Sequence, residues 1–248
     1  MAAASKSKKI DRDEETVSSL AQNYLISLYM LREEVGVATM SRLAEQLASS
    51  PVTEHLGTSL ASVAGMVRRM KRDGLLELKP NKEIVFTERG GAEAEKIMRR
   101  HQLVERMLVD YLGMELHKVH AEAHRLEHAI SPDVESKLAE RLGNPQTCPF
   151  GHPIPGSGYQ VPESAMTLDQ VEPGTTVIVE RIPEDDPQLV QYLVGSRIVR
   201  NQRMVVTDVA AYKGTVTLDV DGDEVVVGLQ VAPRILVRLE SETPPADA

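Results

Sequence analysis

Apolar residues in the first third of the chain recur at helical spacing, three or four positions apart. Residues 17–35, 39–48 and 59–73 each carry such a stripe. Gly36 and the polar stretch SSPVTEHLGT, which spans residues 49–58, separate the stripes. The positions predicted to face a core are Val17, Leu20, Tyr24, Leu28 and Leu31, then Met40, Leu43, Ala44 and Leu47, then Val63, Val67 and Met70.

A hairpin pattern follows these helices. Residues 76–87 form two short apolar runs around Pro80-Asn81-Lys82, which predicts two strands joined by a turn. The order helix, helix, helix, hairpin is that of a winged helix-turn-helix. Residues 88–112 and 115–142 then predict longer helices, and the stretch after them is irregular and rich in proline and glycine.

From Leu168 onward the pattern changes to short β-rich runs. Asp221-Gly222 is a hairpin turn signal, and one helix-like stretch, DPQLVQYLVG, interrupts the strands. Short strands at close spacing predict a small SH3-like β-barrel. We therefore expect a mainly α protein with small β parts: a winged helix-turn-helix, an all-α domain and a C-terminal SH3-like barrel, followed by a disordered tail at 241–248.

Composition narrows the class of protein. The 248 residues are 42% hydrophobic, which is enough for two or three small domains with cores of their own. Aromatic residues make up 3% and tryptophan is absent, which argues against stacking platforms for single-stranded nucleic acid. No apolar run is long enough for a membrane span, and the N-terminus lacks an apolar signal segment, so we expect a cytoplasmic protein without a membrane partner. A single cysteine, Cys148, excludes an internal disulfide and is expected to be an inert, partly buried thiol.

The net charge of −9 is unevenly distributed. The first 90 residues are close to neutral and hold clusters of basic side chains, and phosphate binding depends on the local field rather than the total charge. A helix-turn-helix can be purely structural, but serines at a helix start suit base edges or phosphates, and arginines behind them suit phosphates. The candidate contacts to double-stranded DNA are Ser59, Ser62, Arg68, Arg69 and Arg72 on the third helix, and Lys79 and Lys82 on the hairpin.

Imidazoles and carboxylates share helix faces in the middle of the chain. His101 and Glu105 are four positions apart, and the second set follows the pattern i, i+4, i+7, i+8 with His120, His124, Glu127 and His128. Burying such groups without partners is costly, and a divalent cation satisfies both types. Nitrogen and oxygen ligands suit Mn²⁺, Fe²⁺, Co²⁺, Ni²⁺ or Zn²⁺.

Two other uses of this stripe stay open: a metal-dependent hydrolase and a metal-storage protein. Nothing matches H-E-x-x-H, however, and no nucleophile motif is present, so we expect neither an enzyme nor a small-molecule substrate. A plain surface helix with scattered histidines is the third alternative.

These motifs resemble the diphtheria-toxin-repressor family of metal-dependent transcriptional regulators, which has iron-responsive and manganese-responsive branches. The matching stretches are YLISLYML, RDGLLEL, FTERG, RRHQLVERML, LHKVHAEAHRLEHAISPDVESKL and CPFGHPIPG. PGTTVIVERI and PQLVQYL are similar to the FeoA/SH3-like module appended to many members. The resemblance implies a DNA-binding domain at 1–90, a metal-binding and dimerisation domain at 91–143, a linker at 144–164 and a FeoA-like domain at 165–240.

The resemblance also implies two metal sites. The ancillary site would use His101, Glu105, His120, Asp185 and Gln188, with Glu184 as a substitute for Asp185. The primary, regulatory site would use Asn23, His124, Glu127 and His128. The iron branch has Cys at the position of His124 and Met at that of Asn23, so the absence of sulfur slightly favours Mn²⁺ over Fe²⁺, although Zn²⁺, Co²⁺ or Ni²⁺ can bind in vitro.

The function implied is that of a metal-activated repressor of metal-homeostasis genes. Family members bind pseudo-palindromic operators as homodimers, and metal would select the arrangement in which both recognition helices fit the DNA. The sequence departs from the family in the DNA-binding part. Its turn at 49–57 is longer than usual, and Ala64 and Gly65 stand where polar base-reading side chains are expected, so DNA shape is expected to carry part of the specificity.

Overall fold

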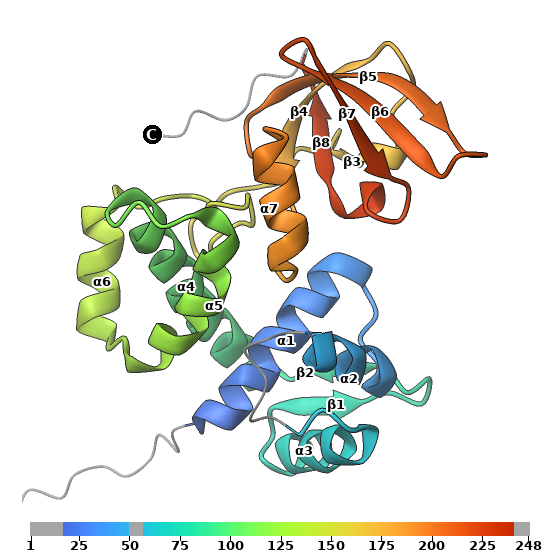
Figure 1. The fold of residues 1–248 in the computed structure, drawn as a ribbon. Helices are drawn as coiled ribbons and strands as arrows, with labels where there is room; N and C mark the ends of the chain where they lie inside the picture. Colours follow the sequence, from blue (N-terminus) through green and yellow to red (C-terminus); the bar gives the residue numbers. More distant parts are fainter. Residues whose placement is uncertain (1–16, 50–56, 241–248) are drawn as a thin grey trace, which may run out of the picture.

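A computed structural model describes residues 17–49 and 57–240, which form three modules (Figure 1). Most of the predicted loop at 49–58 and the whole tail at 241–248 lie outside the described residues. None of the helices described is long and apolar enough to cross a membrane. The helices are α1 (Ser19–Val35), α2 (Met40–Ser49), α3 (Leu60–Arg72), α4 (Glu88–Asp110), α5 (Leu116–Leu126), α6 (Pro132–Arg141) and α7 (Pro187–Gly195).

The first module is the predicted winged helix-turn-helix. Ser18 caps α1 and Ser59 caps α3, each accepting a hydrogen bond from a backbone N–H of the first turn. Strands β1 (Leu76–Leu78) and β2 (Ile84–Phe86) pair antiparallel as the wing. One core prediction is wrong, because Leu20 is 41% exposed and α1 instead buries Ala21 and Leu25 beside the predicted Tyr24 and Leu28.

The second module contains α4, α5 and α6, as expected from the long apolar stripes. Gly90 lets the start of α4 pack closely against the backbone at the start of the wing, because a Cβ at this position would lie 1.8 Å from the carbonyl oxygen of Leu75. Helix α5 ends in one short 3-10 turn, Glu127–Ala129, and Ser131 with Pro132 then starts α6. This change of direction keeps Glu127 buried at the end of α5.

The third module is a six-stranded antiparallel sheet in the order β3-β8-β4-β5-β6-β7, with α7 inserted between β4 and β5. The hairpin predicted at Asp221-Gly222 connects β6 and β7, and both residues have positive φ. This is the small SH3-like β module expected from the short runs. The strands are β3 (Met166–Thr167), β4 (Thr176–Arg181), β5 (Arg203–Ala210), β6 (Thr215–Val220), β7 (Asp223–Gly228) and β8 (Leu236–Leu239).

The proline- and glycine-rich segment 144–164 packs between the second and third modules. Cys148 and Phe150 are fully buried and belong to a core that continues from α4 and α5 into the sheet. Gly151 has a φ of 100°, and a Cβ there would lie 2.1 Å from the carbonyl oxygen of Glu180. The segment therefore holds the sheet close against the helical module, and this contact positions the site described next.

Candidate metal centre and DNA-binding face

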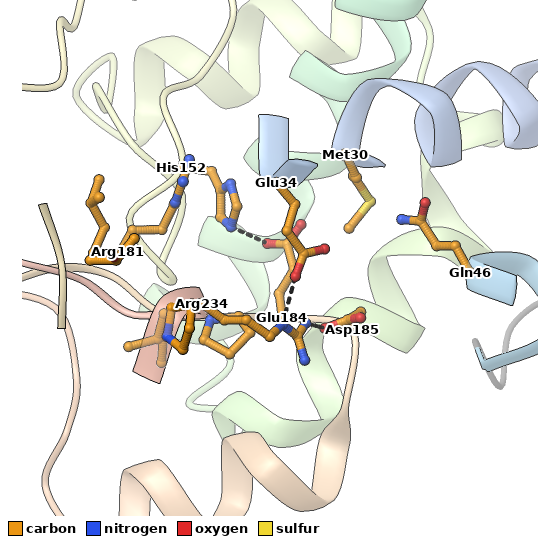
Figure 2. Close-up of a pocket in the computed structure, with 13 residues that line it drawn as sticks. Met30, Glu34, Gln46, His152, Arg181, Glu184, Asp185 and Arg234 are labelled. Carbon is orange, nitrogen blue, oxygen red and sulfur yellow. Dashed lines mark hydrogen bonds and ion pairs between the residues drawn. The ribbon is translucent and has the colours of Figure 1, made fainter. Parts of the chain in front are cut away.

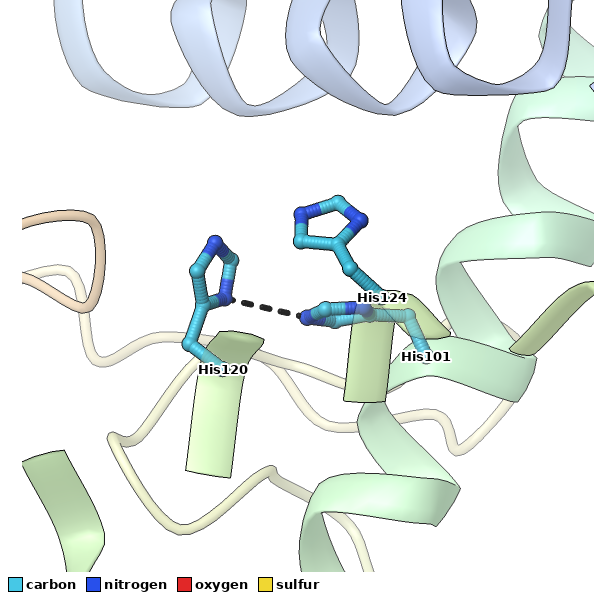
Figure 3. Close-up of side chains that lie close together, drawn as sticks. All are labelled: His101, His120 and His124. Atoms are coloured by element: carbon cyan, nitrogen blue, oxygen red, sulfur yellow. Dashed lines mark hydrogen bonds between the residues drawn. The ribbon is translucent and has the colours of Figure 1, made fainter. Parts of the chain in front are cut away.

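His101 lies at the centre of a buried cluster of imidazoles and carboxylates. Its Nδ1 is 2.6 Å from Glu127 Oε2, and its Nε2 is 3.0 Å from Glu105 Oε1 and 3.1 Å from His120 Nδ1. The helical spacing explains the contact with Glu105, which lies one turn further along α4. Figure 3 shows how His101 on α4 faces His120 and His124 on α5.

Glu184, which follows β4, brings the third module into this cluster. Its Oε1 lies 4.0 Å from His120 Nδ1, and one ligand atom from each of four side chains falls within 4.8 Å of the others: His101, Glu105, His120 and Glu184. The sequence interpretation named Glu184 only as the substitute for Asp185. The structure places the substitute in the cluster.

Asp185 and Gln188, the expected late ligands, are not brought to the cluster. Asp185 forms an ion pair with Arg234, and Gln188 is exposed in the first turn of α7. Asp186 caps this helix by accepting hydrogen bonds from the backbone N–H groups of the first turn. With the start of α7 fixed in this way, Glu184 is the carboxylate that is buried.

Burial disfavours the charged form of every group in the cluster. Three of the groups are kept charged by neighbours of opposite charge. Burial tends to lower the pKa of His101, but the negative charges of Glu105 and Glu127 outweigh the effect of burial and hold this pKa well above its usual range. Burial likewise tends to raise the pKa of Glu127, yet His124 and His101 lower it to about 2. The pKa of Glu105 is lowered for the same reason, against its burial, mainly by His101.

Two groups of the cluster respond to burial in the expected direction. Burial lowers the pKa of His120 to about 4. Burial, with the nearby carboxylate of Glu105, raises the pKa of Glu184 to about 7 despite His152. Glu105 Oε2 is buried and has no hydrogen-bond partner within residues 17–49 and 57–240. Carboxylates close together, a neutral imidazole and an unpartnered buried oxygen are what a divalent cation would satisfy, so the residues present fit a bound metal.

The side chains predicted for the primary site also meet in space. Glu127 Oε1 lies 3.2 Å from His124 Nδ1 and 3.4 Å from His128 Nε2. Asn23 reaches across from α1, where its Oδ1 is 2.8 Å from His128 Nε2. The group is therefore assembled from the DNA-binding module and the helical module, and it is less buried than the cluster around His101.

The two predicted sites are continuous, because His101 contacts Glu105 on one side and Glu127 on the other. Gln22, which the sequence interpretation did not include, also belongs here, since its Oε1 lies 2.9 Å from His128 Nδ1. A proton on Nδ1, donated to Gln22, leaves Nε2 of His128 available as a ligand. In the sequence, only the position of Gln22 next to Asn23 could have indicated this contact.

Cys148 and His152 flank Glu184 on the side away from His120. Cys148 Sγ is 3.9 Å from Glu184 Oε2, and His152 Nε2 is 3.8 Å from the same oxygen. Cys148 is fully buried rather than partly buried, and burial together with Glu105 and Glu184 holds the pKa of its thiol well above the usual range. Both residues lie in an irregular segment, where no helical spacing reveals a shared face.

The candidate DNA contacts all lie on one part of the first module. The five residues of the α3 region and the two of the wing are exposed: Ser59, Ser62, Arg68, Arg69, Arg72, Lys79 and Lys82. Two of these cations have acidic neighbours, because Arg69 lies 3.7 Å from Asp73 and Lys79 lies 3.3 Å from Glu83. In Figure 1, α3 and the wing lie at the end of the molecule opposite the sheet, which leaves them accessible.

A winged helix joined to a buried imidazole and carboxylate cluster defines a DNA-binding protein with a metal centre. Comparison with known proteins agrees with this class. The N-terminal DNA-binding domain of iron-dependent repressors matches residues 16–84, their metal-binding and dimerisation domain matches 87–156, and the FeoA domain matches 166–239.

Individual relatives extend this match over most of the chain. The iron-dependent repressor IdeR of Mycobacterium leprae is 38% identical over 214 residues, which cover 81% of this chain and 88% of the relative. The diphtheria toxin repressor of Corynebacterium glutamicum is 42% identical over 135 residues, which cover 54% of this chain and 55% of that protein. A solved manganese-dependent transcriptional repressor in complex with manganese superposes with a TM-score of 0.77 at 31% identity, covering 88% of this chain and 99% of its own.

The chain belongs to the diphtheria-toxin-repressor family of metal-dependent transcriptional repressors. Its relatives include both iron-dependent and manganese-dependent members, so the family does not decide between the two metals. Because the family consists of repressors and not of enzymes, the hydrolase interpretation of the histidine stripe is set aside.

Proposed function

We propose that a divalent metal activates this repressor by fixing its DNA-binding module against its helical module. The observation that carries the proposal is the 2.8 Å contact between Asn23 of α1 and His128 of the helical module. Asn23 and the recognition helix α3 belong to the same module, whose helices share one core. A ligand that ties Asn23 to His128 therefore restricts the position of α3.

Two groups of side chains would hold the metal. Asn23, His124, Glu127 and His128 would form the regulatory site, and His101, Glu105, His120 and Glu184 would form the ancillary one. The ancillary set has Glu184 in place of the expected Asp185 and Gln188, because the Glu184 carboxylate is buried and its Oε1 lies 4.0 Å from His120 Nδ1. A bound cation would supply positive charge that balances the carboxylates. Nitrogen and oxygen ligands alone slightly favour Mn²⁺ over Fe²⁺.

The residues of the chain can act as a switch only if metal binds more tightly to one arrangement of the modules. The primary group is already close together, because Asn23 Oδ1 lies 2.8 Å and Glu127 Oε1 lies 3.4 Å from His128 Nε2. A preference of about 100-fold for the DNA-competent arrangement corresponds to roughly 2.7 kcal/mol, which is typical of coupling between two sites. DNA must then tighten metal binding by the same factor.

We further propose that the repressor is a homodimer on a pseudo-palindromic operator. Apolar side chains are exposed at the end of α4 and on α6, where Tyr111 is 55% exposed, Leu112 66% and Val134 50%. Tyr111 and Val134 line one shallow apolar hollow. Such a patch marks an interface, and two-fold symmetry would present two copies of α3 to successive major grooves. Because the partner is chromosomal DNA, the proposal places the protein in the cytoplasm.

The decisive experiment is DNA binding with and without metal. Duplexes selected from a randomised pool by the wild-type chain in Mn²⁺ serve as probes, and fluorescence anisotropy compares Mn²⁺, Fe²⁺, Zn²⁺ and chelator. We expect binding about 100-fold tighter with the activating metal. Equal affinity in metal and chelator would refute metal activation. Tight metal binding without any selected duplex would instead support the storage protein that the sequence left open.

A further inference from the structure

His152 stands between carboxylates that come from two different modules. Its Nδ1 is 3.2 Å from Glu33 Oε2 on α1, and its Nε2 is 3.8 Å from Glu184 Oε2 at the end of β4. The His152 side chain is 13% exposed, and its Nε2 has no hydrogen-bond partner among the described residues. Figure 2 shows the imidazole directed toward the Glu184 carboxylate. One side chain thus connects the DNA-binding module to the third module.

The carboxylate of Glu184 has a different neighbour at each oxygen. Oε1 lies 4.0 Å from His120 Nδ1, inside the group of candidate ligands. Oε2 lies on the other side, 3.8 Å from His152. Because the two oxygens belong to one rigid planar group, any restraint on Oε1 also restrains Oε2. The orientation of Glu184 in the cluster and its contact with His152 are therefore linked.

Helix α1 is contacted at both ends by the rest of the protein. Near its start, Gln22 and Asn23 contact His128 of the helical module. Near its end, Glu33 contacts His152, and Glu34 Oε1 lies 2.6 Å from Arg234 Nε. Figure 2 shows the pair formed by Glu34 and Arg234. A helix is a stiff element, so contacts at its two ends together determine its orientation.

We propose that His152 is a positioning residue that couples the His101–Glu105–His120–Glu184 group to the end of α1 through Glu33. The proposal rests on the metal activation proposed above. With an ion held by this group, the Glu184 carboxylate would be restrained at Oε1; its Oε2 would then restrain the His152 ring, and the ring would restrain Glu33. The third module thereby contributes to activation by holding the DNA-binding module at a point far from Asn23 along α1.

The ring contacts can be separated by substitution. His152→Asn keeps an amide N–H near the position of Nδ1, where it can still donate to Glu33, but is too short to reach Glu184. His152→Ala removes both contacts. Arg203→Gln is the matched control, because it removes an ion pair with Glu240 that lies within the third module and is exposed. Glu33→Ala tests the same connection from α1 if the alanine variant at 152 does not fold.

The measurement is hydrogen exchange of the α1 amides at 28–34, with Mn²⁺ and with chelator, in the full chain. In the wild type and in Arg203→Gln, we expect Mn²⁺ to slow exchange about tenfold. In His152→Asn, His152→Ala and Glu33→Ala, we expect less than half of that slowing on a logarithmic scale. A second measurement is urea unfolding in chelator, where the effects of His152→Ala and Glu33→Ala should be non-additive because the residues are in contact.

A role confined to packing gives a different result. In that case His152→Asn, which keeps the contact with α1, would show the full slowing by Mn²⁺, and this outcome would overturn the proposal while leaving metal activation intact. A wild-type chain whose exchange and DNA binding both ignore every metal tested would refute the proposed function, and the coupling with it. The two failures are therefore distinguishable.

Discussion

The candidate metal centre and the outer face of α3 are built in opposite ways. In the centre, nearly every polar atom contacts another polar side chain, and His101 alone contacts Glu105, His120 and Glu127. On α3, the basic side chains are exposed, and no described residue outside this helix lies within 4 Å of the position of a Cβ on Gly65. The first region is specified by internal contacts, whereas the second is specified by a partner outside the chain. Substitutions in the two regions should therefore affect different measurements.

The difference between the regions also separates fold stability from function. Groups inside the candidate centre are held by charge and burial, so we expect that changing them alters metal affinity and the response to pH. Groups on α3 contribute little to the core, so changing them alters operator binding with little loss of stability. The predictions below test this separation, starting with the largest expected effect.

The largest effect is expected for His128→Ala, which removes the side chain that meets Asn23 at 2.8 Å. Metal-stimulated operator binding should fall by about 100-fold, to the level seen in chelator. Fluorescence anisotropy with a selected duplex measures the affinity, and circular dichroism with sedimentation checks that the variant remains a folded oligomer. Stimulation of wild-type size would exclude His128 from the regulatory site.

Metal affinity should depend steeply on pH. Burial beside Glu105 raises the pKa of Glu184 to about 7, so this carboxyl group carries a proton below that pH. It must lose the proton to solvent before the carboxylate can bind a cation. The raised pKa of His101, which Glu105 and Glu127 maintain against its burial, requires release of a second proton. Mn²⁺ affinity should therefore fall by about 100-fold for each unit that the pH drops well below 7, because each of the two released protons contributes about a factor of ten.

The check on this prediction is calorimetry of Mn²⁺ binding in buffers with different ionisation enthalpies. At pH 6.5 we expect release of at least one proton per cluster, and Glu184→Gln should release about one proton fewer than the wild type. Binding without any proton release would mean that the cation does not contact the His101 cluster.

Substitutions of the candidate ligands from the third module should have a smaller effect on metal activation. Glu184→Gln should weaken activation about tenfold, because it removes the only carboxylate that the described part of the third module places in the cluster. Asp185→Ala with Gln188→Ala should change activation less, since Asp185 pairs with Arg234 and Gln188 is exposed. The ratio of operator affinities in Mn²⁺ and chelator measures both. The reverse order of effects would restore the ligands expected from the resemblance.

These regions also differ in how far the sequence predicts them. Helical spacing identified His101 with Glu105 and His120 with His124, because residues one turn apart share a face whatever the fold does elsewhere. It could not place Gln22 beside His128 or His152 beside Glu33, because the residues of each pair are more than 100 positions apart. The exchange of Asp185 for Glu184 has a local cause, since the capped start of α7 decides which carboxylate is buried.

The fold was predicted more completely than the site. The winged hairpin, the long helices and the turn at Asp221-Gly222 follow from local patterns that tertiary contacts did not override. Leu20 is the exception on α1: its 41% exposure shows that a stripe predicts a face only to within one position. The packing of Cys148 and Phe150 depends on the sheet of the third module, a contact that no local pattern encodes.

The smallest effect is expected on α3, from Arg69→Ala and Gly65→Ala. Arg69 is exposed, and the carboxylate of Asp73 is 3.7 Å away, so removal of Arg69 should cost little stability and should flatten the salt dependence of operator binding by about one phosphate contact. An unchanged slope in a salt titration would remove Arg69 from the phosphate contacts.

Gly65 separates the two regions most sharply. A glycine inside a helix lowers stability, and no contact within the described protein requires a glycine at this position. It lies inside α3, is exposed, and leaves open space where a Cβ would be. Alanine there should stabilise the chain by about 1 kcal/mol through helix propensity. If the bare face of α3 lies against the DNA, the added methyl group stands at that interface, and operator affinity should fall several-fold while urea unfolding shows a more stable protein.

Ser136→Ala, at an exposed position of α6, is the matched control, since it also raises helix propensity but lies outside the DNA-binding module. It should stabilise the chain slightly and leave operator binding unchanged. Operator affinity that Gly65→Ala leaves intact would show that this face of α3 does not approach the duplex closely. Base recognition would then fall to Ser59 and Ser62 at the start of the helix, where both hydroxyl groups are exposed and 2.9 Å apart.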